Sequence, residues 1–489
     1  YYMTDRDYNH SRSLDVHRWS DYSEVNPFID ELYNNHIKDI SENARIQKKH
    51  LKLVLLDLFI AWIDDPELDI GVHMHEGAYS DGTIFNIGKS RYNELNIKVS
   101  TIKVVHRLRD LGFIGFKKGY EGSVEYAPRL SRIWATDKLI SLFKEAAFSY
   151  FDINYSKDRE VVILRNEDKQ DIEYDDSKPI QEMRDLLRDY NALLNTTFID
   201  IPELDIPRIE LEEKKQRRRR NKPIFVNISH HDKFTRRIFN NSSFEEGGRF
   251  YGGWWQRIDE SQRSRIRLNN LPIIEIDYSA LHVILAYTEI KEDYWKLTDK
   301  DPYRVPIDGI NNPEHIRDIN KLFFLLSLNA SNEISLYKAF RSELDYKEYP
   351  YKFPDKVLAK LLEDIKLLHP KIAHLICSGA GLRLMSLDSK MVEFIIREFV
   401  KTNTPILTVH DSFVVPFGQE DRLHKLMKKA FMSVSKQEIV RIKYNPNITE
   451  RALYVSQHQD RGYFLDAVSF IKKVNPSKGY EYRLKRHNK

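Results

Sequence analysis

The stretch Pro405–Pro416 reads PILTVHDSFVVP. An apolar, partly β-branched run leads up to His410-Asp411-Ser412, and a second apolar run follows at once. Both runs are short and prolines bracket the whole, so we expect two strands joined by a tight turn. The turn lifts the Asp411 carboxylate, with His410 beside it, to the tip of a hydrophobic hairpin. A charge in this place suits a metal ligand better than it suits stability.

A second carboxylate is expected because one rarely holds a catalytic Mg²⁺ alone. The best candidate is Asp277, within Leu271–Tyr287 (LPIIEIDYSALHVILAY), where the predicted strand Ile273–Ile276 runs into it and an amphipathic helix follows. Mg²⁺ uses few carboxylates and completes its shell with water and phosphate oxygens. Two such ions about 4 Å apart activate an attacking hydroxyl and stabilise a leaving pyrophosphate. Asp277 and Asp411 are therefore predicted to be the metal ligands.

Between the two acids lies Arg317–Ser331, RDINKLFFLLSLNAS. Arg317 and Lys321 are spaced so that they share one face of a helix, and we expect the opposite face to be formed by leucines. Arg is a planar fork for phosphate and Lys is a point charge. This helix is therefore predicted to grip a triphosphate.

These segments, taken in order, resemble those of a polymerase superfamily. DYSALH, which begins at Asp277, resembles motif A of family A DNA polymerases, and VHDSF resembles motif C of phage-type single-subunit RNA polymerases. R-x3-K resembles the motif B helix that both families share. EEGGR, Glu245–Arg249, resembles their motif that touches the template–product duplex. The resemblance covers roughly Lys222–Pro416, and the first half of the chain shows none of it.

The resemblance implies an α+β right-hand polymerase with palm, fingers and thumb. Its partners would be a nucleic acid template, a primer and nucleoside triphosphates, and its cofactor two Mg²⁺ ions, for which Mn²⁺ substitutes. Asp277, Asp411, His410 and Lys321 would be the catalytic residues, with His410 supporting Asp411 or the primer end. The nucleotide-binding residues would be Arg317, Lys321, Tyr278, His282 and Asn329.

Three departures from the pattern concern the choice of sugar. His282 stands where family A DNA polymerases carry a Glu that excludes the ribose 2′-OH, and Asn329-Ala330 replace an aromatic residue and Gly. Ser412 is the RNA polymerase form. The chain thus lies between the two families, and we expect it to belong to their relatives in mobile elements, plasmids and viruses. We expect ribonucleotides to be accepted, so priming is a possible activity; the product, the primer requirement, the template type and the pathway stay open.

Composition narrows the class of protein. The chain has 489 residues, 41% of them hydrophobic, which predicts several domains with large cores. Its net charge of +4 is small, so local clusters must carry any nucleic-acid argument. The single Cys377 excludes an internal disulfide and predicts a cytoplasmic protein. The longest apolar run, Val54–Ile63, is too short to span a membrane, so no membrane partner is expected.

The N-terminal half resembles a winged helix-turn-helix domain. A short helix precedes the helix Thr101–Leu111, and a basic hairpin is predicted from Phe113–Lys117 and Ser123–Tyr126. Lys103 and Arg107 on the second helix would contact DNA. The alternative is a winged helix that contacts only protein.

Two further basic regions are candidate nucleic-acid contacts. Arg and aromatic residues alternate through Ile224–Leu268, a composition that suits phosphate binding and base stacking. The nucleic-acid-binding residues expected here are Arg249, Arg263, Arg265 and Arg267. The run within Glu210–Lys222 is predicted to be a linker that touches nucleic acid.

We expect five regions along the chain. They are a mobile polar arm (1–46), the winged-helix-like domain (47–150), a linker with a thumb-like helix at Ile180–Leu194 (151–222), the palm and fingers (223–470), in which the helix Lys390–Val400 packs under the hairpin, and a basic tail (471–489). The oligomeric state is not predicted.

Two alternatives to a polymerase remain. A non-catalytic, DNA-binding replication initiator or regulator would keep the winged helix with a decayed palm. An HD-type metal phosphohydrolase would use His410-Asp411 as its HD pair, but it would need further His ligands on helices, whereas this pair is predicted in a strand turn.

Overall fold

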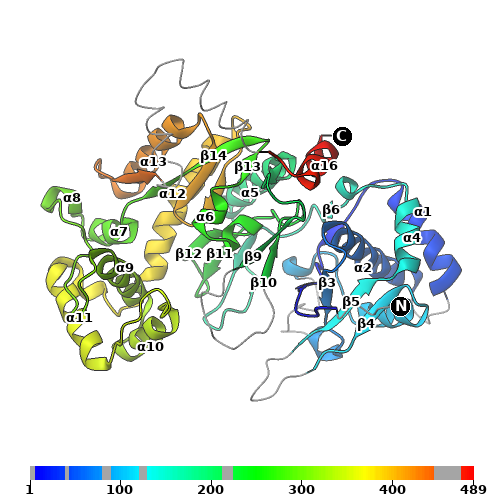
Figure 1. Cartoon of the computed structure of the whole chain (residues 1–489), viewed down its shortest axis with the longest axis horizontal. Coiled ribbons are helices and arrows are strands. Elements are labelled where there is room, and N and C mark those ends of the chain that lie inside the picture. Colours follow the sequence, from blue (N-terminus) through cyan, green and yellow to red (C-terminus); the bar gives the residue numbers. More distant parts are fainter. Residues whose placement is uncertain are drawn as a thin grey trace.

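The computed structural model describes residues 6–38, 43–79, 90–120, 129–211, 224–444 and 475–488. These residues form a mixed α+β protein, which confirms the predicted class at that level. They are organised around two hydrophobic cores, one N-terminal and one built from the rest of the chain (Figure 1). None of the helices in the described ranges is long and apolar enough to cross a membrane.

The N-terminal unit surrounds one long helix, α2, whose residues from Leu51 to Ala61 are all buried. Its sheet has the order β1-β3-β5-β4, in which β3, β5 and β4 are antiparallel neighbours and β1 runs parallel to β3. The elements are β1 (Ser11–Ser13), β2 (Arg18–Trp19), α1 (Val25–Leu32), η1 (Tyr33–Ile37), α2 (Ala44–Asp64), β3 (Asp69–Val72), η2 (Glu76–Tyr79), η3 (Arg91–Asn93), α3 (Ser100–Asp110), β4 (Ile114–Lys117), β5 (Ser131–Ala135), α4 (Asp137–Glu145) and η4 (Tyr150–Asp152).

The prediction of a mobile arm at residues 1–46 is wrong for the part that the structure describes. β1 is hydrogen-bonded to β3, and Val25, Ile29 and Leu32 of α1 are buried in the N-terminal core. Their spacing of three and four residues is that of one helix face, which the polar residues around them conceal in the sequence.

The predicted hairpin after α3 is confirmed in its first strand only. β4 follows the expected position, but its partner is β5, with Lys117 opposite Arg132. The segment Ser123–Tyr126, predicted as the returning strand, lies outside the described residues, as does the basic run Lys214–Arg220.

The sheet that carries the candidate site has the order β15-β16-β14-β13-β8, and β17 pairs with the remaining edge of β14. The predicted hairpin is confirmed: Val409 of β15 is paired with Ser412 of β16, which leaves His410 and Asp411 as the turn. His410 has φ +58°, a left-handed conformation that lets so short a turn close. The strands are β8 (Ile199–Asp200), β13 (Arg267–Leu268), β14 (Leu271–Tyr278), β15 (Leu407–Val409), β16 (Ser412–Pro416) and β17 (Ile442–Tyr444).

A second sheet, β12-β11-β7, lies beside it and carries Arg249. Two small two-stranded sheets join β9 to β10 and β2 to β6. The strands are β6 (Asn154–Tyr155), β7 (Val162–Leu164), β9 (Arg208–Leu211), β10 (Ile224–Asn227), β11 (Arg236–Asn240) and β12 (Ser243–Tyr251).

Helices cover these sheets, and α8 to α11 form a separate lobe on the left of Figure 1, with α12 running between that lobe and the sheets. The predicted helix Lys390–Val400 is confirmed as part of α12, with Met391, Ile395 and Phe399 fully buried, and it packs mainly against β12 and α13. The helical segments are α5 (Lys178–Thr196), η5 (Trp254–Arg257), α6 (Glu260–Arg263), α7 (Leu281–Glu289), α8 (Tyr294–Leu297), α9 (Pro313–Asn329), α10 (Glu333–Glu343), α11 (Asp355–Leu368), η6 (Pro370–Leu375), α12 (Gly381–Val400), α13 (Glu420–Ser435) and α16 (Lys478–His487).

Two helices differ from the expectation in what they contact. α9 buries Phe323, Phe324 and Leu328, so its inner face is aromatic rather than the leucine stripe that the sequence indicates. α5 is a helix as predicted, and it packs into the main core: the Tyr190 hydroxyl donates to the backbone oxygen of Ile406, at 2.9 Å.

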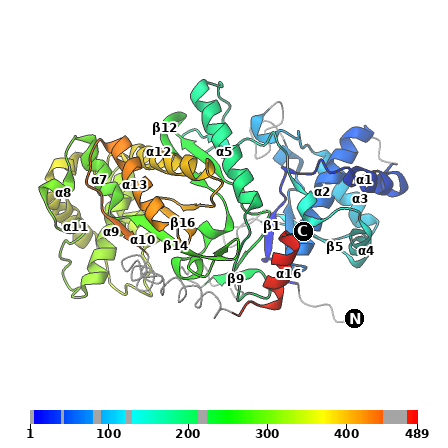
Figure 2. The ribbon, with the colours of Figure 1, turned by 90° about the horizontal axis from the view of Figure 1, so that it is seen from above.

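The C-terminal helix α16 is not a loose basic tail. It lies between the sheets and the N-terminal unit (Figure 2). Tyr480 is buried and its hydroxyl donates to Asn270, and Arg483 forms an ion pair with Asp200.

Candidate active site

The two predicted aspartates lie at the same end of a strand pair. Asp277, near the end of β14, is opposite Ser412 of β16, and Asp411 is the residue before Ser412 in the turn. Burial and the negative charge of Asp411 raise the pKa of Asp277 to about 7. Asp277 and Asp411 are 134 residues apart in the sequence, and the structure brings their carboxyl groups together.

The Asp277 carboxylate has a donor on one oxygen and none on the other. Lys443 of β17 stands directly opposite Asp277, and its Nζ lies 3.1 Å from Asp277 Oδ2. Asp277 Oδ1 is buried without a hydrogen-bond partner among the residues that the structure describes. A buried carboxylate oxygen without a donor costs free energy unless a cation or water meets it.

This donor set fits a divalent cation. Hard oxygen ligands from one or two carboxylates are what Mg²⁺ takes from proteins, and an orphaned oxygen is free to supply one of them. Within the described ranges, no group of three or more His, Cys, Asp or Glu side chains is placed to hold a metal. The candidate ligands are the two aspartates that the β14–β16 pairing brings together.

A buried ion pair supports the strands that carry the aspartates. Arg263 donates to both oxygens of Glu275, at 3.1 and 2.9 Å, and the Ser412 hydroxyl donates to Glu275 at 2.8 Å. Glu275 thereby links β14 to the first residue of β16. The guanidinium of Arg263 is thus paired inside the protein, and its contact with nucleic acid stays a prediction.

The neighbouring arginines are also occupied. Arg267 is buried in β13, where burial lowers its pKa, and it donates to a backbone oxygen. Its contact with nucleic acid also stays a prediction. Arg265 donates to Gln262 and lies 3.7 Å from Glu203, so only part of its guanidinium is open.

Arg249, Asp388 and His282 form a network next to the aspartates. Arg249 donates to Asp388 at 2.5 Å and to His282 Nε2 at 2.9 Å. Asp388 is buried on α12, and burial raises its pKa while the Arg249 charge opposes that rise. The charge of Asp411 acts on all three groups, which places the network beside the turn.

His282 is a neutral imidazole in this network. Burial and the positive charge of Arg249 lower its pKa to about 4. Its Nε2 accepts from Arg249, so the ring presents an acceptor there and keeps its proton on Nδ1.

Lys321 reaches the site from α9. Its positive charge lowers the pKa of both Asp277 and His282, so it lies close to each. Its ammonium makes no hydrogen bond or ion pair with any residue that the structure describes. Arg317, one turn earlier, is held by Asp301 at 2.7 Å and lies over the ring of Tyr303.

Three other predicted site residues have different surroundings. Tyr278 is buried and its hydroxyl donates to the Met427 backbone, and its role as a nucleotide contact stays a prediction. Asn329 is exposed at the end of α9 and caps it by donating to the Leu325 oxygen. His410 is exposed in the turn, with its ring 6.2 Å from that of Tyr251.

Sequence reasoning missed four residues of the site: Glu275, Tyr303, Asp388 and Lys443. Tyr303 is buried, and the charges of Asp411 and Asp277 contribute to raising its pKa. Of these four residues, only Asp388 has a recognisable signal in the sequence, because it is an acid among the apolar positions of a helix. The others depend on partners that are distant in the sequence.

The two residues of α3 that are predicted to contact DNA have different surroundings. Lys103 is exposed, whereas Arg107 donates to the His36 backbone oxygen at 3.1 Å and is therefore partly committed inside the unit.

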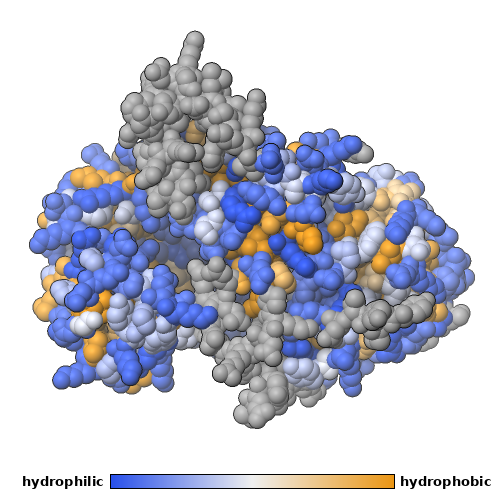
Figure 3. Space-filling view, in the orientation of Figure 1, coloured by the Kyte–Doolittle hydropathy of each residue, from blue (hydrophilic) through white to orange (hydrophobic). Residues whose placement is uncertain are grey.

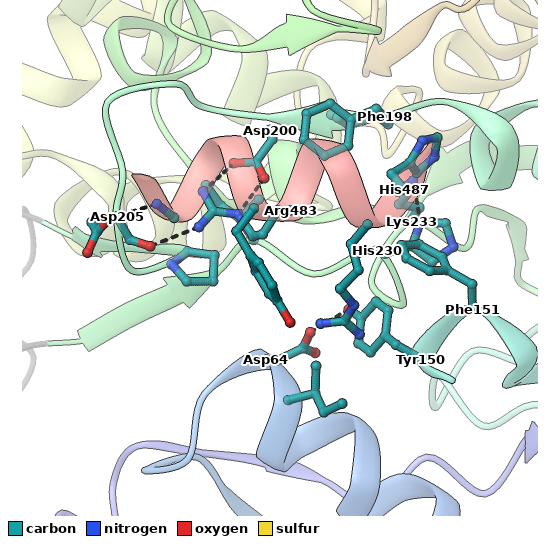
Figure 4. Close-up of a pocket in the computed structure, with 17 residues that line it drawn as sticks. Asp64, Tyr150, Phe151, Phe198, Asp200, Asp205, His230, Lys233, Arg483 and His487 are labelled. Carbon is teal, nitrogen blue, oxygen red and sulfur yellow. Dashed lines mark hydrogen bonds and ion pairs between the residues drawn. The ribbon is translucent and has the colours of Figure 1, made fainter. Parts of the chain in front are cut away.

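A cavity of about 210 Å³ lies elsewhere, between the end of α2, β8 and α16 (Figure 4). Asp64 and Tyr150 face it from the N-terminal unit, and Arg483 and His487 face it from α16. Burial raises the pKa of Asp64 to about 6, while Ser229 donates to it at 2.6 Å. Neither Asp277 nor Asp411 lines this cavity, so it is a junction between the two cores and not the candidate active site.

Seen from the face of Figure 3, the surface is hollowed between the α9–α11 lobe and the sheets, and the residues visible in the hollow are hydrophilic.

No protein-family model matches the chain, and no curated protein matches it significantly. Among solved structures it is similar to the POL domain of Pol1 from M. smegmatis, a structure in complex with DNA primer-template and dNTP, at 15% identity and a TM-score of 0.25. The match covers 43% of this chain and 47% of that one, so it spans under half of either.

Proposed function

We propose that this protein is a template-directed nucleic-acid polymerase that joins nucleotides at Asp277 and Asp411. The observation that carries the proposal is the pairing of β14 with β16, which sets the two carboxylates side by side with one buried oxygen left without a partner. Carboxylates on adjacent strands are the ligand arrangement that metal-assisted nucleotidyl transfer needs.

Asp277 and Asp411 would hold the divalent ions, Mg²⁺ or Mn²⁺. When bound, two such ions supply activation of the attacking hydroxyl and stabilisation of the leaving pyrophosphate. The protein contributes positioning and fixed charge around them. Lys443 opposes the rise in the pKa of Asp277 through an ion pair, and Glu275 with Ser412 fixes the strand that directly follows Asp411.

The positive groups around the carboxylates support a polyphosphate site. Lys321 has no protein partner within the described residues, so its ammonium is available to neutralise charge on the triphosphate as pyrophosphate leaves. Arg317 is one turn from it on the same helix, and its pairing with Asp301 orients the guanidinium. Helices α8 to α11 would then serve as fingers above a palm formed by β14 and β16.

The network of Arg249, Asp388 and His282 would position the growing end and the sugar. Within the described residues, Arg249 has donors beyond those that it gives to Asp388 and His282, and it lies beside Asp411. His282 is neutral and polar, so it offers a hydrogen bond to a ribose hydroxyl instead of the repulsion that a carboxylate would give. This supports acceptance of ribonucleotides, and with it a role in priming.

The N-terminal unit would bind the template as a winged helix. The antiparallel order β3-β5-β4, with α2 before it and α3 between β3 and β4, is the connectivity that this kind of domain uses. Lys103 is exposed on α3 in the position of a DNA contact. A unit of this kind joined to a polymerase suits replication or priming of a mobile element, plasmid or virus; the alternative is a winged helix that contacts protein.

The two other functions have less support. A replication initiator with a decayed palm does not need paired carboxylates whose burial is costly, yet these are present. An HD-type phosphohydrolase uses ligands on helices, whereas His410 and Asp411 form a strand turn.

Synthesis on defined templates tests the proposal. Wild-type protein, with Mg²⁺ or Mn²⁺, is given primed and unprimed DNA and RNA templates together with ribo- or deoxyribonucleotides. Template-dependent products on any of these support it, and the pattern assigns the sugar and the primer requirement. No product with either metal and every template would contradict it.

A further inference from the structure

A pocket of about 290 Å³ lies where the N-terminal unit meets the β7–β11 strand pair, away from Asp277 and Asp411. Residues of β1 and β3 with their flanking loops form one wall. The other wall carries three arginines, Arg159, Arg165 and Arg236, which come from either end of β7 and from the start of β11. The parallel pairing of β7 with β11 brings these distant residues together.

Arg236 is the unusual member of this wall. Its Nε is buried without a hydrogen-bond partner, and its guanidinium forms no ion pair within the described ranges. Burial and the positive charges of Arg159 and Arg165 lower its pKa. A partly buried guanidinium that has no partner among the described residues and stands near two like charges is destabilising unless an anion joins it.

The acids of the pocket are already engaged elsewhere. Asp171 accepts from Arg165 at 2.8 Å, and Glu160 accepts from both ends of the Arg184 guanidinium at 3.1 Å. Arg159 is 4.0 Å from Asp15 and rests on the ring of Phe234. The pocket therefore gathers two further arginines around Arg236, whose positive charge Asp171 and Asp15 favour but which has no ion pair of its own within the described residues.

We propose that this pocket binds a phosphate group. Arg236 would be its main hydrogen-bond donor, and Arg159 and Arg165 would add positive charge around it. Arg is suited to this because its planar fork donates two parallel hydrogen bonds to phosphate oxygens. The volume accommodates a phosphate with an attached sugar, below the usual size of a site for a whole drug-like ligand.

The phosphate is assigned to the nucleic-acid strand that the active site uses, and this part rests on the proposed polymerase function. Arg236 is paired in register with Tyr251, whose ring lies 6.2 Å from that of His410 in the turn of Asp411. One strand pair therefore connects the pocket to the catalytic turn. A strand held at Arg236 would pass between the N-terminal unit and the sheet that carries Arg249.

Binding of a fluorescein-labelled single-stranded oligonucleotide, followed by anisotropy, tests the assignment. Arg236→Met should weaken binding about tenfold, as expected for loss of a charge-assisted hydrogen bond. The magnitude of the slope of log affinity against log salt concentration should decrease by about 0.7, the value expected for loss of one phosphate contact on a single strand. Arg188→Met, on the exposed face of α5, removes the same charge elsewhere and should leave the affinity within about twofold.

Thermal unfolding separates binding from a structural role. Arg236→Met should unfold at the wild-type temperature or above, since it removes an unpaired buried charge, and Arg236→Lys should regain part of the affinity. Wild-type oligonucleotide affinity in Arg236→Met, or equal losses in Arg236→Met and Arg188→Met, would overturn the assignment to a strand. A large drop in the unfolding temperature of Arg236→Met that Arg236→Lys restores would make Arg236 a structural residue and overturn the site.

Inorganic phosphate as a second probe distinguishes the source of the phosphate. If phosphate raises the unfolding temperature of wild type and not of Arg236→Met, while the two bind the oligonucleotide equally, the site is real but takes a free phosphate compound, and the strand assignment is overturned. If the polymerase proposal fails instead, the wild-type protein makes no product on any template, while Arg236→Met still weakens oligonucleotide binding.

Discussion

The Asp277 carboxyl lies between the negative charge of Asp411 and the positive charge of Lys443, with one oxygen buried and unpaired. A group held in this way is poised for a cation and is costly without one. Such costs are common where a site is organised for chemistry instead of stability.

Replacing Asp277 with Asn should therefore stabilise the metal-free protein at alkaline pH. The folded state keeps the Asp277 proton up to pH about 7, whereas an unfolded Asp loses it near its ordinary pKa of about 4. Between these values the folded state binds more protons, so this group's contribution to stability falls as the pH rises. Asp277→Asn should raise the free energy of unfolding by about 1–2 kcal/mol at pH 8 and by much less at pH 4–5.

Unfolding followed by circular dichroism in chelator, across that pH range, measures this effect. Asp189→Asn, on the exposed face of α5, is the control and should show no such pH dependence. A variant at Asp277 that is less stable than wild type at pH 8 would mean that the carboxylate pair is not strained.

His282 should set a permissive choice of sugar. Its neutral imidazole accepts from Arg249 and has no charge to repel a 2′-hydroxyl. A site with a polar partner for a hydroxyl does not reject it strongly. The ratio of kcat/KM for matched deoxyribo- and ribonucleotides should lie within about tenfold of one and should move toward the deoxy form in His282→Glu. A deoxy preference of several thousandfold in wild type would contradict this account.

In the proposed site, the α9 helix would supply the charge that meets the triphosphate. Lys321→Ala should raise KM for nucleotide and lower kcat, because the phosphates become more negative as pyrophosphate leaves. Loss of one such charge should cost about 10- to 100-fold in kcat/KM. Lys338→Ala, exposed on α10, is the matched control. Equal kinetics for the two variants would place Lys321 outside the site.

The sequence predicted the strands and helices of the candidate site because each is encoded by a pattern of neighbouring residues. The apolar run that ends in Asp277 predicts a strand, and the two short apolar runs between prolines predict a hairpin. The spacing of four between Arg317 and Lys321 predicts that they share one face of a helix. What local patterns did not predict are partnerships across the chain. Arg263 is taken by Glu275 and Arg249 by Asp388, and only the packed fold decides which arginine remains open.

The N-terminal unit shows the same limit for whole segments. β1 and α1 look polar in sequence, yet they complete the sheet and core that α2 begins. β2 is also paired with β6, which ends at Tyr155. The unit therefore extends on both sides of the expected range 47–150.

A fragment of residues 6–155 should fold and unfold cooperatively, and a fragment of residues 47–150 should not. The shorter one loses Val25, Ile29 and Leu32, whose burial contributes about 1.5–3 kcal/mol each against a usual stability of 5–15 kcal/mol. Thermal unfolding by circular dichroism compares the two. Equal stability would show that β1 and α1 are dispensable.

The longer fragment should bind duplex DNA with marked salt dependence. Lys103→Ala, on the exposed side of α3, should weaken that binding, whereas Lys144→Ala, exposed on α4, should not. A folded fragment with no affinity at low salt would assign the unit to protein contacts.

The central claim is that the two carboxylates brought together by β14 and β16 perform nucleotide transfer. Its most direct test is template-dependent synthesis by Asp277→Asn and Asp411→Asn, with Asp189→Asn as the control. Both site variants should lose synthesis by at least about a thousandfold while they keep folding and oligonucleotide binding, because Asn keeps the shape and removes the anionic ligand. Near wild-type synthesis by either site variant would contradict the account.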